Sequence, residues 1–370
     1  MHRVLIIEGK ELKINELGQP LDRAFYRLYE AYASNVALPW QEFVDAARQF
    51  FDAHPEPSAA HDEYFNNFTV IWQTLLNQAR YGEAEHIWEL AVQPAREWEQ
   101  AQPGRRVHKG TPYYFWAMTA LLRGDTDKGY LLVHQAVDED IKTLGAQDAL
   151  THPGYALVSL NYQKVDQAFR QWVIEQAQFL NGLLTKYTLT HNATLTFEDV
   201  KRRFLDNPPS TETLFVLTYT LARLINLARV PDHIASNPFA GQLELNLLFD
   251  ITLVIDSAIK AKNPADRQFI DHAEYLLAQA AEPLTIDQLR EINRLFNNDF
   301  DNTLRAALDG TLTLQQGVAL RRLQSDVALA YGLRNHGAHN TSTANTIWNR
   351  FPEVQQALFR VLFATIDHLY

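Results

Sequence analysis

The feature that most constrains this chain is the spacing of its apolar residues, which recur every three or four positions along nearly the whole length. One such stripe contains Leu248, Ile251, Ile255 and Ala258. Apolar residues at that spacing share one face of an α-helix, whereas a strand needs strict alternation. Glycine and proline, 15 of each, cluster between the periodic segments and end them. The sequence therefore predicts an all-α fold, with residues 3–8 as the one candidate strand.

The composition narrows the class of protein. A hydrophobic fraction of 46% and a charged fraction of 21% are typical of a soluble globular chain. The absence of cysteine excludes disulfides, thiolate metal sites and cysteine nucleophiles. The apolar run near the N-terminus is too short for a signal peptide, and Arg223 interrupts the longest apolar stretch, residues 214–230. We therefore expect a cytoplasmic protein that does not bind a membrane.

The net charge of −11 bears on nucleic-acid binding. Proteins that coat nucleic acid carry basic stripes, because contacts with phosphates supply most of the affinity. A broad, sequence-independent binder is therefore excluded. A small local site can still engage RNA through a few residues.

A linker-like segment suggests where the chain divides. Residues 230–241 contain two prolines together with Asp, Ser, Asn and Gly, which favour turns and loops. The sequence predicts a helical N-terminal domain over residues 1–235. It also predicts a C-terminal bundle of four to five helices over residues 236–370.

The N-terminal domain contains two helix pairs that look alike. Three positions of the first pair have counterparts 45 residues later: Leu76, Ala84 and Ala91 correspond to Leu121, Gly129 and Ala136. The second pair resembles the turn and second helix of a tetratricopeptide-type repeat, over about one and a half units and at a longer period than that family has. The resemblance implies a solenoid-like region that recognises a protein partner or activator. A non-repetitive helical domain is the alternative.

A polar cluster ends an apolar helix near the C-terminus, where residues 333–340 read "LRNHGAHN". Arg334 lies four residues after Ala330 and takes the place of the next apolar residue of the stripe. Arg334 and His339 are five apart, about 140° around an ideal helix. Two copies related by a two-fold axis would bring both side chains into one shared groove.

These residue types suit cleavage of an RNA phosphodiester. Histidine can remove the proton from the attacking 2′-hydroxyl, or protonate the leaving 5′-oxygen, near neutral pH. The rigid guanidinium of arginine binds two phosphate oxygens and stabilises the extra charge of the transition state. An asparagine can donate to a phosphate or hold the imidazole in one tautomer. No metal ion is required.

The segment resembles the signature of the HEPN superfamily, in which Arg is followed by a polar residue and, after roughly four to six residues, by His. Arg334, Asn335 and His339 match those three places. The resemblance covers about the last third of the chain. It implies a helical bundle, a homodimer with composite sites and metal-independent ribonuclease activity. Such proteins often act as toxins or as effectors of antiviral defence.

The prediction is therefore an endoribonuclease without cofactor or metal. Its catalytic residues are Arg334, Asn335 and His339, and its further RNA contacts are His336 and Asn340. One alternative is a non-catalytic HEPN-type module that only dimerises or holds RNA. Another is a scaffold in which the helical repeats bind proteins. In a third, Arg334 and His339 only cap the last carbonyls of their helix.

Three other patterns are weaker. Arg80 with His86, and Arg267 with His272, share the Arg-to-His spacing but lack a polar Asn, Asp or His after the arginine. A zinc site at His336 and His339 would have no acidic or cysteine partner in the local sequence. The acidic stretch over residues 134–152 is expected to be a solvated helix end rather than a cation site.

Overall fold

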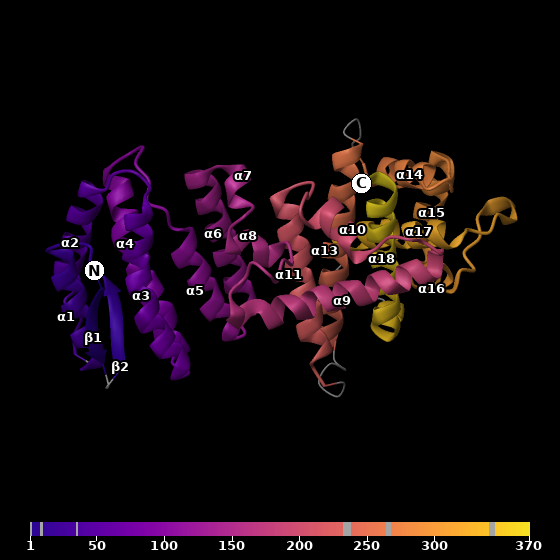
Figure 1. Cartoon of the computed structure of the whole chain (residues 1–370). Helices are drawn as coiled ribbons and strands as arrows, with labels where there is room; N and C mark the ends of the chain where they lie inside the picture. Colours follow the sequence, from indigo (N-terminus) through magenta and orange to yellow (C-terminus); the bar gives the residue numbers. More distant parts are fainter. Residues whose placement is uncertain (1, 8–9, 35, 232–237, 264–267, 340–344) are drawn as a thin grey trace. The chain divides into compact units, whose positions relative to one another are not determined.

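The computed structural model describes residues 2–7, 10–34, 36–231, 238–263, 268–339 and 345–370. Helices make up about 78% of the structure, so the predicted all-α class is confirmed (Figure 1). None of the helices in the described ranges is both long enough and apolar enough to span a membrane.

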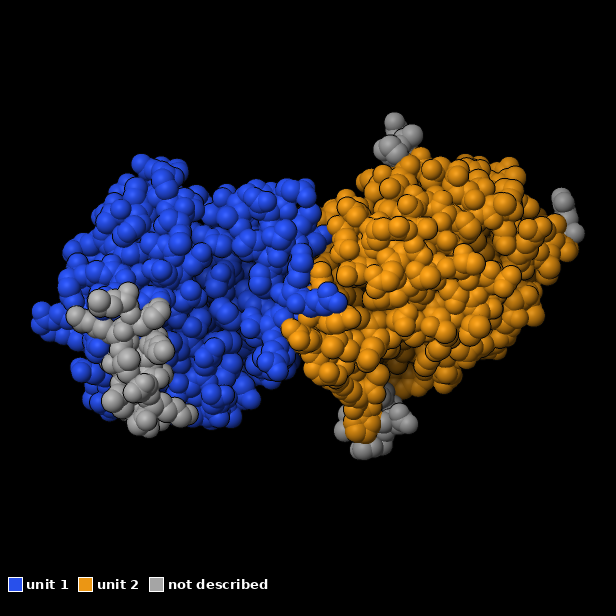
Figure 2. Space-filling model, in the orientation of Figure 1, with its two compact units in different colours: residues 1–157, 163–169 blue, residues 158–162, 170–370 orange. Residues whose placement is uncertain are grey.

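The chain forms two compact units, coloured separately in Figure 2. Unit 1 comprises residues 1–157 and 163–169, and unit 2 comprises residues 158–162 and 170–370. The division therefore falls well before the 235/236 boundary expected from the linker-like segment. The reason is that α11 (Thr211–Ala228) packs against α13 (Pro238–Lys262), with the Thr213 and Ser257 hydroxyls 2.6 Å apart. Residues 230–241 thus connect two helices of the same unit.

Unit 1 opens with a β-hairpin. The candidate strand at residues 3–8 is present as β1 (His2–Ile7), and β2 (Lys10–Asn15) pairs with it in antiparallel register. The second strand was not predicted, because its six residues alternate too briefly for a clear signal. Helices follow: α1 (Leu21–Ala33), α2 (Trp40–Ala53), α3 (Ala59–Asn77), α4 (Tyr81–Ala101), α5 (Gly110–Leu122), α6 (Thr126–Leu144), α7 (Ala146–Ala149) and α8 (Pro153–Val158).

The α5–α6 hairpin shows why small residues recur in this region. A turn at Gly124 ends α5, and the Asp125 side chain caps α6 by accepting from the amide of Lys128. A Cβ atom at Gly129 would lie 2.4 Å from the Leu121 side chain. The two helices therefore approach closely where the sequence places glycine. Assignment of this hairpin to the tetratricopeptide type stays a prediction.

Unit 2 contains six helices between residues 238 and 370 of the described chain, where four to five were expected. The earlier helices of the unit are α9 (Gln167–His191), α10 (Phe197–Val200), the short π-helix η1 (Lys201–Leu205) and α11. After α13 come α14 (Phe269–Gln279), α15 (Ile286–Asn298), α16 (Phe300–Asp309), α17 (Arg322–His339) and α18 (Asn345–Leu369).

Local capping explains the unexpected helix. Thr285 and Gln288 form a capping box at the start of α15. α15 ends at Asn298, and the Asp299 side chain caps α16 by accepting from the amide of Asn302. Gly310 then ends α16 in a left-handed conformation. An aspartate before and a glycine after a short apolar segment are the signals that sequence reasoning overlooked.

The last two helices have irregular starts. α17 starts at Arg322, after a segment in which Thr313 forms an isolated β-bridge with Ala319. α18 consists of two helical pieces that meet at a kink at Arg350, and Pro352 lies in the first turn of the second piece. The proline lies inside this helix and is accommodated by non-helical backbone angles at Arg350, as its missing amide hydrogen and bulky ring require.

A buried ion pair fixes α17 on α18. Asp326 accepts two hydrogen bonds from the guanidinium of Arg360, at 2.7 and 2.6 Å. Both side chains are almost fully buried. Because an unpaired charge in this position would be costly, the fork defines the register of the two helices. It thereby positions the polar end of α17.

Candidate functional site

The polar end of α17 packs closely against α15 at Gly332, which has no side chain. A Cβ atom at Gly332 would lie 2.5 Å from the ring of Phe296 on α15. The neighbours Tyr331 and Leu333 are buried, whereas Arg334 is half-buried. The close approach at Gly332 therefore places the next turn of α17 beside its neighbours, with Arg334 at the edge of the core.

Arg334 and Asn335 line a pocket of about 390 Å³ in unit 2. Its walls come from α13, α14 and α17. The polar residues of the lining are Asp256, Lys260, Gln268, His272, Tyr331, Arg334 and Asn335. Two basic side chains, an imidazole, a carboxylate, a phenol and two amides thus share one small hollow, and such groups can bind an oxyanion and transfer protons.

The guanidinium of Arg334 is only partly paired. Its Nη2 atom lies 3.7 Å from Oδ2 of Asp256, beyond hydrogen-bonding distance. Its Nε atom is buried and has no hydrogen-bond partner among the described residues. About a third of the side chain, 32%, is exposed. Arg334 therefore retains donors for a ligand in the pocket.

His272 positions the carboxylate that faces Arg334. Its Nδ1 atom lies 2.5 Å from Oδ1 of Asp256, and the imidazole is buried. This hydrogen bond orients the second carboxylate oxygen toward Arg334. Because so little of the His272 ring is accessible, we regard it as a positioning residue rather than as a group that touches a substrate.

Asn335 is held on both sides. Its amide nitrogen donates to Oδ1 of Asn293 on α15, at 2.9 Å. It also hydrogen-bonds Tyr331, and this contact lowers the pKa of the tyrosine, although burial has the larger effect and raises it overall. The Tyr331 ring in turn stacks on Phe269. The amide of Asn335 is therefore fixed in orientation at the wall of the pocket.

The remaining predicted residues are placed as follows. His336 does not line the pocket; its ring stacks on Phe300 of α16, with the ring centroids 3.8 Å apart. His339 is the last residue of α17, and its side chain lies outside the described part of the structure. Asn340 also lies outside the described residues. The structure thus brings together Arg334 and Asn335 of the predicted set.

Sequence reasoning missed Asp256, Lys260 and His272. The available signal was a carboxylate inside the otherwise apolar stripe of α13, one residue after Ile255. His272 and Arg267 have the Arg-to-His spacing but lack the polar residue after the arginine. Arg267 lies outside the described residues. In the other match, Arg80 forms an ion pair with Glu83 of its own helix region.

Comparisons of the chain with protein-family models, with curated proteins and with solved structures found no match.

Proposed function

We propose that the protein is a metal-independent endoribonuclease of the HEPN type, with Arg334 as the residue that stabilises the transition state. The observation that carries the proposal is the partly exposed, incompletely paired guanidinium of Arg334 in a pocket that also contains Lys260 and Asn335. A phosphate is the ligand that best satisfies such donors, because a guanidinium binds two of its oxygens at once.

The reaction is an attack of the ribose 2′-oxygen on the adjacent phosphorus. The bond from phosphorus to the 5′-oxygen breaks, which leaves a 2′,3′-cyclic phosphate and a 5′-hydroxyl. His339 exchanges the protons that this step requires, one from the 2′-hydroxyl and one to the 5′-oxygen. Arg334 and Lys260 stabilise the charge on the non-bridging oxygens, and Asn335 orients the phosphate.

Asp256 tunes the affinity of this site. Its carboxylate would repel a phosphate, yet it lies 3.7 Å from the guanidinium and is held there by His272. It therefore keeps Arg334 extended in the pocket while leaving most of the donors available. In the proposed homodimer, His339 of one copy and Arg334 of the other act on one phosphate, as the resemblance implies.

His339→Ala tests the proposal. Purified full-length protein is incubated with a mixed single-stranded RNA in a buffer that contains a chelator, and the 3′ ends of the products are analysed. We expect the unchanged protein to yield 2′,3′-cyclic phosphates and His339→Ala to lose at least about 100-fold of the rate. His368→Ala, which changes an exposed histidine at the end of α18, is the matched control.

The outcome also separates the alternative functions. Binding of RNA without cleavage by the unchanged protein would favour a non-catalytic module. Neither binding nor cleavage would favour a scaffold in which unit 1 recognises a protein partner. A role as a defence effector or toxin follows only if expression of the active protein arrests cells and His339→Ala relieves the arrest.

A further inference from the structure

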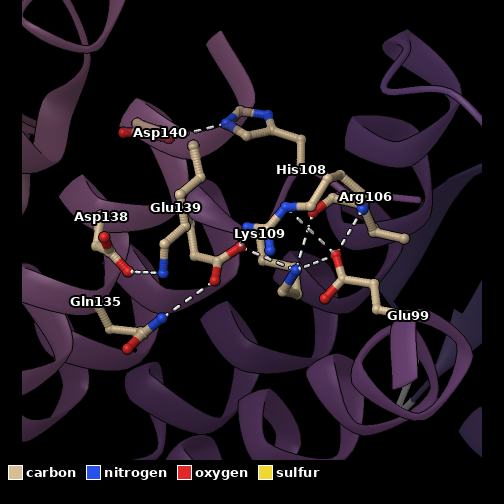
Figure 3. A network of polar contacts seen from close by, with 10 residues as sticks. Glu99, Arg106, His108, Lys109, Gln135, Asp138, Glu139 and Asp140 are labelled. Carbon is tan, nitrogen blue, oxygen red and sulfur yellow. Dashed lines mark hydrogen bonds and ion pairs between the residues drawn. The ribbon is translucent and has the colours of Figure 1, made fainter. Parts of the chain in front are cut away.

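A cluster of two histidines and an aspartate lies in unit 1, whereas the residues assigned to RNA cleavage belong to unit 2. His108 precedes α5, Asp140 lies on the last turn of α6, and His152 precedes α8. One ligand atom from each residue can be chosen so that all three lie within 4.8 Å of one another. Figure 3 shows His108 pointing toward Asp140.

This arrangement differs from the solvated helix end that the acidic stretch predicts. Asp138 behaves as expected, since it is half-exposed and pairs with Lys142 on the same helix. Glu139 and Asp140 are instead buried. The helix turns these two carboxylates inward, so they need partners inside the unit.

The spacing of the three side chains suits a metal ion. Nε2 of His108 lies 2.8 Å from one oxygen of Asp140, and Nδ1 of His152 lies 3.8 Å from the other. A tetrahedral ion with bonds of about 2.1 Å holds its ligand atoms roughly 3.4 Å apart. The observed separations lie on either side of that value, and all three ligand atoms lie within 4.8 Å of one another.

Two features around the cluster hold the ligands in place. The carboxylate of Asp62 lies 3.3 Å from Nδ1 of His108, which directs the opposite nitrogen toward Asp140. A carboxylate on the outer nitrogen of a ligating histidine is the usual support of a zinc site. Gly110 makes room for the inner carboxylate, since a Cβ there would lie 1.7 Å from Oδ1 of Asp140.

The local charge also favours a divalent cation. Glu99 and Glu139 surround Lys109 and also contact Arg106, so these four charges compensate one another. The carboxylates of Asp62 and Asp140 remain, and within the described part of the chain their ion-pair partners are imidazoles. Two negative charges are matched by one Zn²⁺, whereas a single protonated imidazole matches one of them.

We propose that His108, Asp140 and His152 form a binding site for a divalent transition-metal ion of the zinc class. Imidazole and carboxylate together select such ions over Ca²⁺ or Mg²⁺, which prefer oxygen ligands alone. His152 is 31% exposed and gives the ion a route from solvent. Three protein ligands leave one tetrahedral position for water or a further ligand.

The test is titration of the full-length, tag-free protein with ZnSO₄ by calorimetry after removal of metal with a chelator. We expect one strong site per chain. His152→Ala should weaken it at least about tenfold, because a ligand is lost from a side chain that contributes little to the core. His86→Ala changes an exposed histidine of the same unit and should leave the affinity unchanged.

A spectroscopic measurement on the unchanged protein tests the site without depending on whether a variant folds. Four-coordinate Co²⁺ with nitrogen and oxygen ligands absorbs visible light much more strongly than six-coordinate aqueous Co²⁺ does. The unchanged protein should show this absorption, and equimolar Zn²⁺ should remove it. Absence of the absorption, absence of Zn²⁺ binding, or equal losses in His152→Ala and His86→Ala would each overturn the proposal.

Discussion

Lys109 and Arg334 are both basic side chains that line a pocket, one in unit 1 and the other in unit 2. Lys109 is 2% exposed, and its ammonium contacts the carboxylates of Glu99 and Glu139 at 2.5 and 2.9 Å and the carbonyl of Val107 at 3.0 Å. Arg334 is 32% exposed and has one carboxylate at 3.7 Å. The ammonium of Lys109 is fully used within the protein, whereas the guanidinium of Arg334 is not.

The difference separates a structural charge from one that is available to a ligand. A buried charge is tolerated only when its partners satisfy it, so all donors of Lys109 are directed inward (Figure 3). A charge at a pocket edge can remain incompletely paired, because solvent or a ligand completes its contacts. The geometry of pairing, rather than the residue type, therefore distinguishes the two basic groups.

The largest expected effect is on folding, from Lys109→Met. The substitution leaves the buried Glu139 and the half-buried Glu99 with Arg106 as their remaining cation, and breaking such a buried pair costs about 3–5 kcal/mol of unfolding free energy. Urea denaturation measures the change. Arg48→Ala, which removes an exposed pair with Glu97, should cost less than about 1 kcal/mol. Similar losses of unfolding free energy in both variants would show that Lys109 is no more structural than an exposed, paired arginine.

The next effect is on activity, from Arg334→Ala. Loss of a donor to the transition state should lower the rate of RNA cleavage about 10²- to 10³-fold. The free energy of unfolding should change by less than about 1 kcal/mol, because the pair with Asp256 is long and partly solvated. Arg290→Ala, at an exposed arginine of α15, is the control. An unfolded Arg334→Ala would show that the residue is structural, as Lys109 is.

A smaller and opposite effect is expected from Asp256→Asn. Removal of the carboxylate abolishes its repulsion of phosphate, so RNA should bind several-fold more tightly, by about 1 kcal/mol. Fluorescence anisotropy with labelled RNA measures this in the His339→Ala background, where the RNA stays intact. Weaker binding would indicate that Asp256 serves chiefly to position Arg334.

The smallest effect concerns a carboxyl group of α13 without an ion-pair partner among the described residues. Burial raises the pKa of Glu244 to about 7 from 4.5. The folded state therefore holds this proton more tightly than the unfolded state. The resulting stabilisation is complete below about pH 4.5 and is lost as the pH rises through 7.

Glu244→Gln removes this titration. The variant should gain stability relative to the unchanged protein between about pH 5 and pH 8, by less than about 1 kcal/mol because the side chain is half-exposed. Thermal unfolding at both pH values measures the gain. A difference in stability between the two proteins that is the same at both pH values would show that the Glu244 carboxyl group has an ordinary pKa.

Helical periodicity predicted the fold class because burial of one face repeats along each helix, and that repetition is visible in a single sequence. Helix boundaries that depend on a single capping residue were harder to predict, as the start of α16 after Asp299 shows. At the site, Arg334 was predictable because it replaces an apolar residue at the end of a stripe, and Asn335 because it is the polar residue directly after that arginine. Asp256 and His272 were not, because they lie on helices far upstream and meet α17 only through tertiary packing.

The contact between Gly332 and Phe296 has a consequence for how the sequence can vary. With 2.5 Å between the ring and a hypothetical Cβ, a larger residue at 332 requires the ring of Phe296 to move. A homologue with alanine at 332 is expected to carry a smaller residue at 296, so the two positions should covary. Because Gly332 lies two residues before Arg334, covariation of positions 332 and 296 would indicate that the packing that positions the arginine is maintained among homologues.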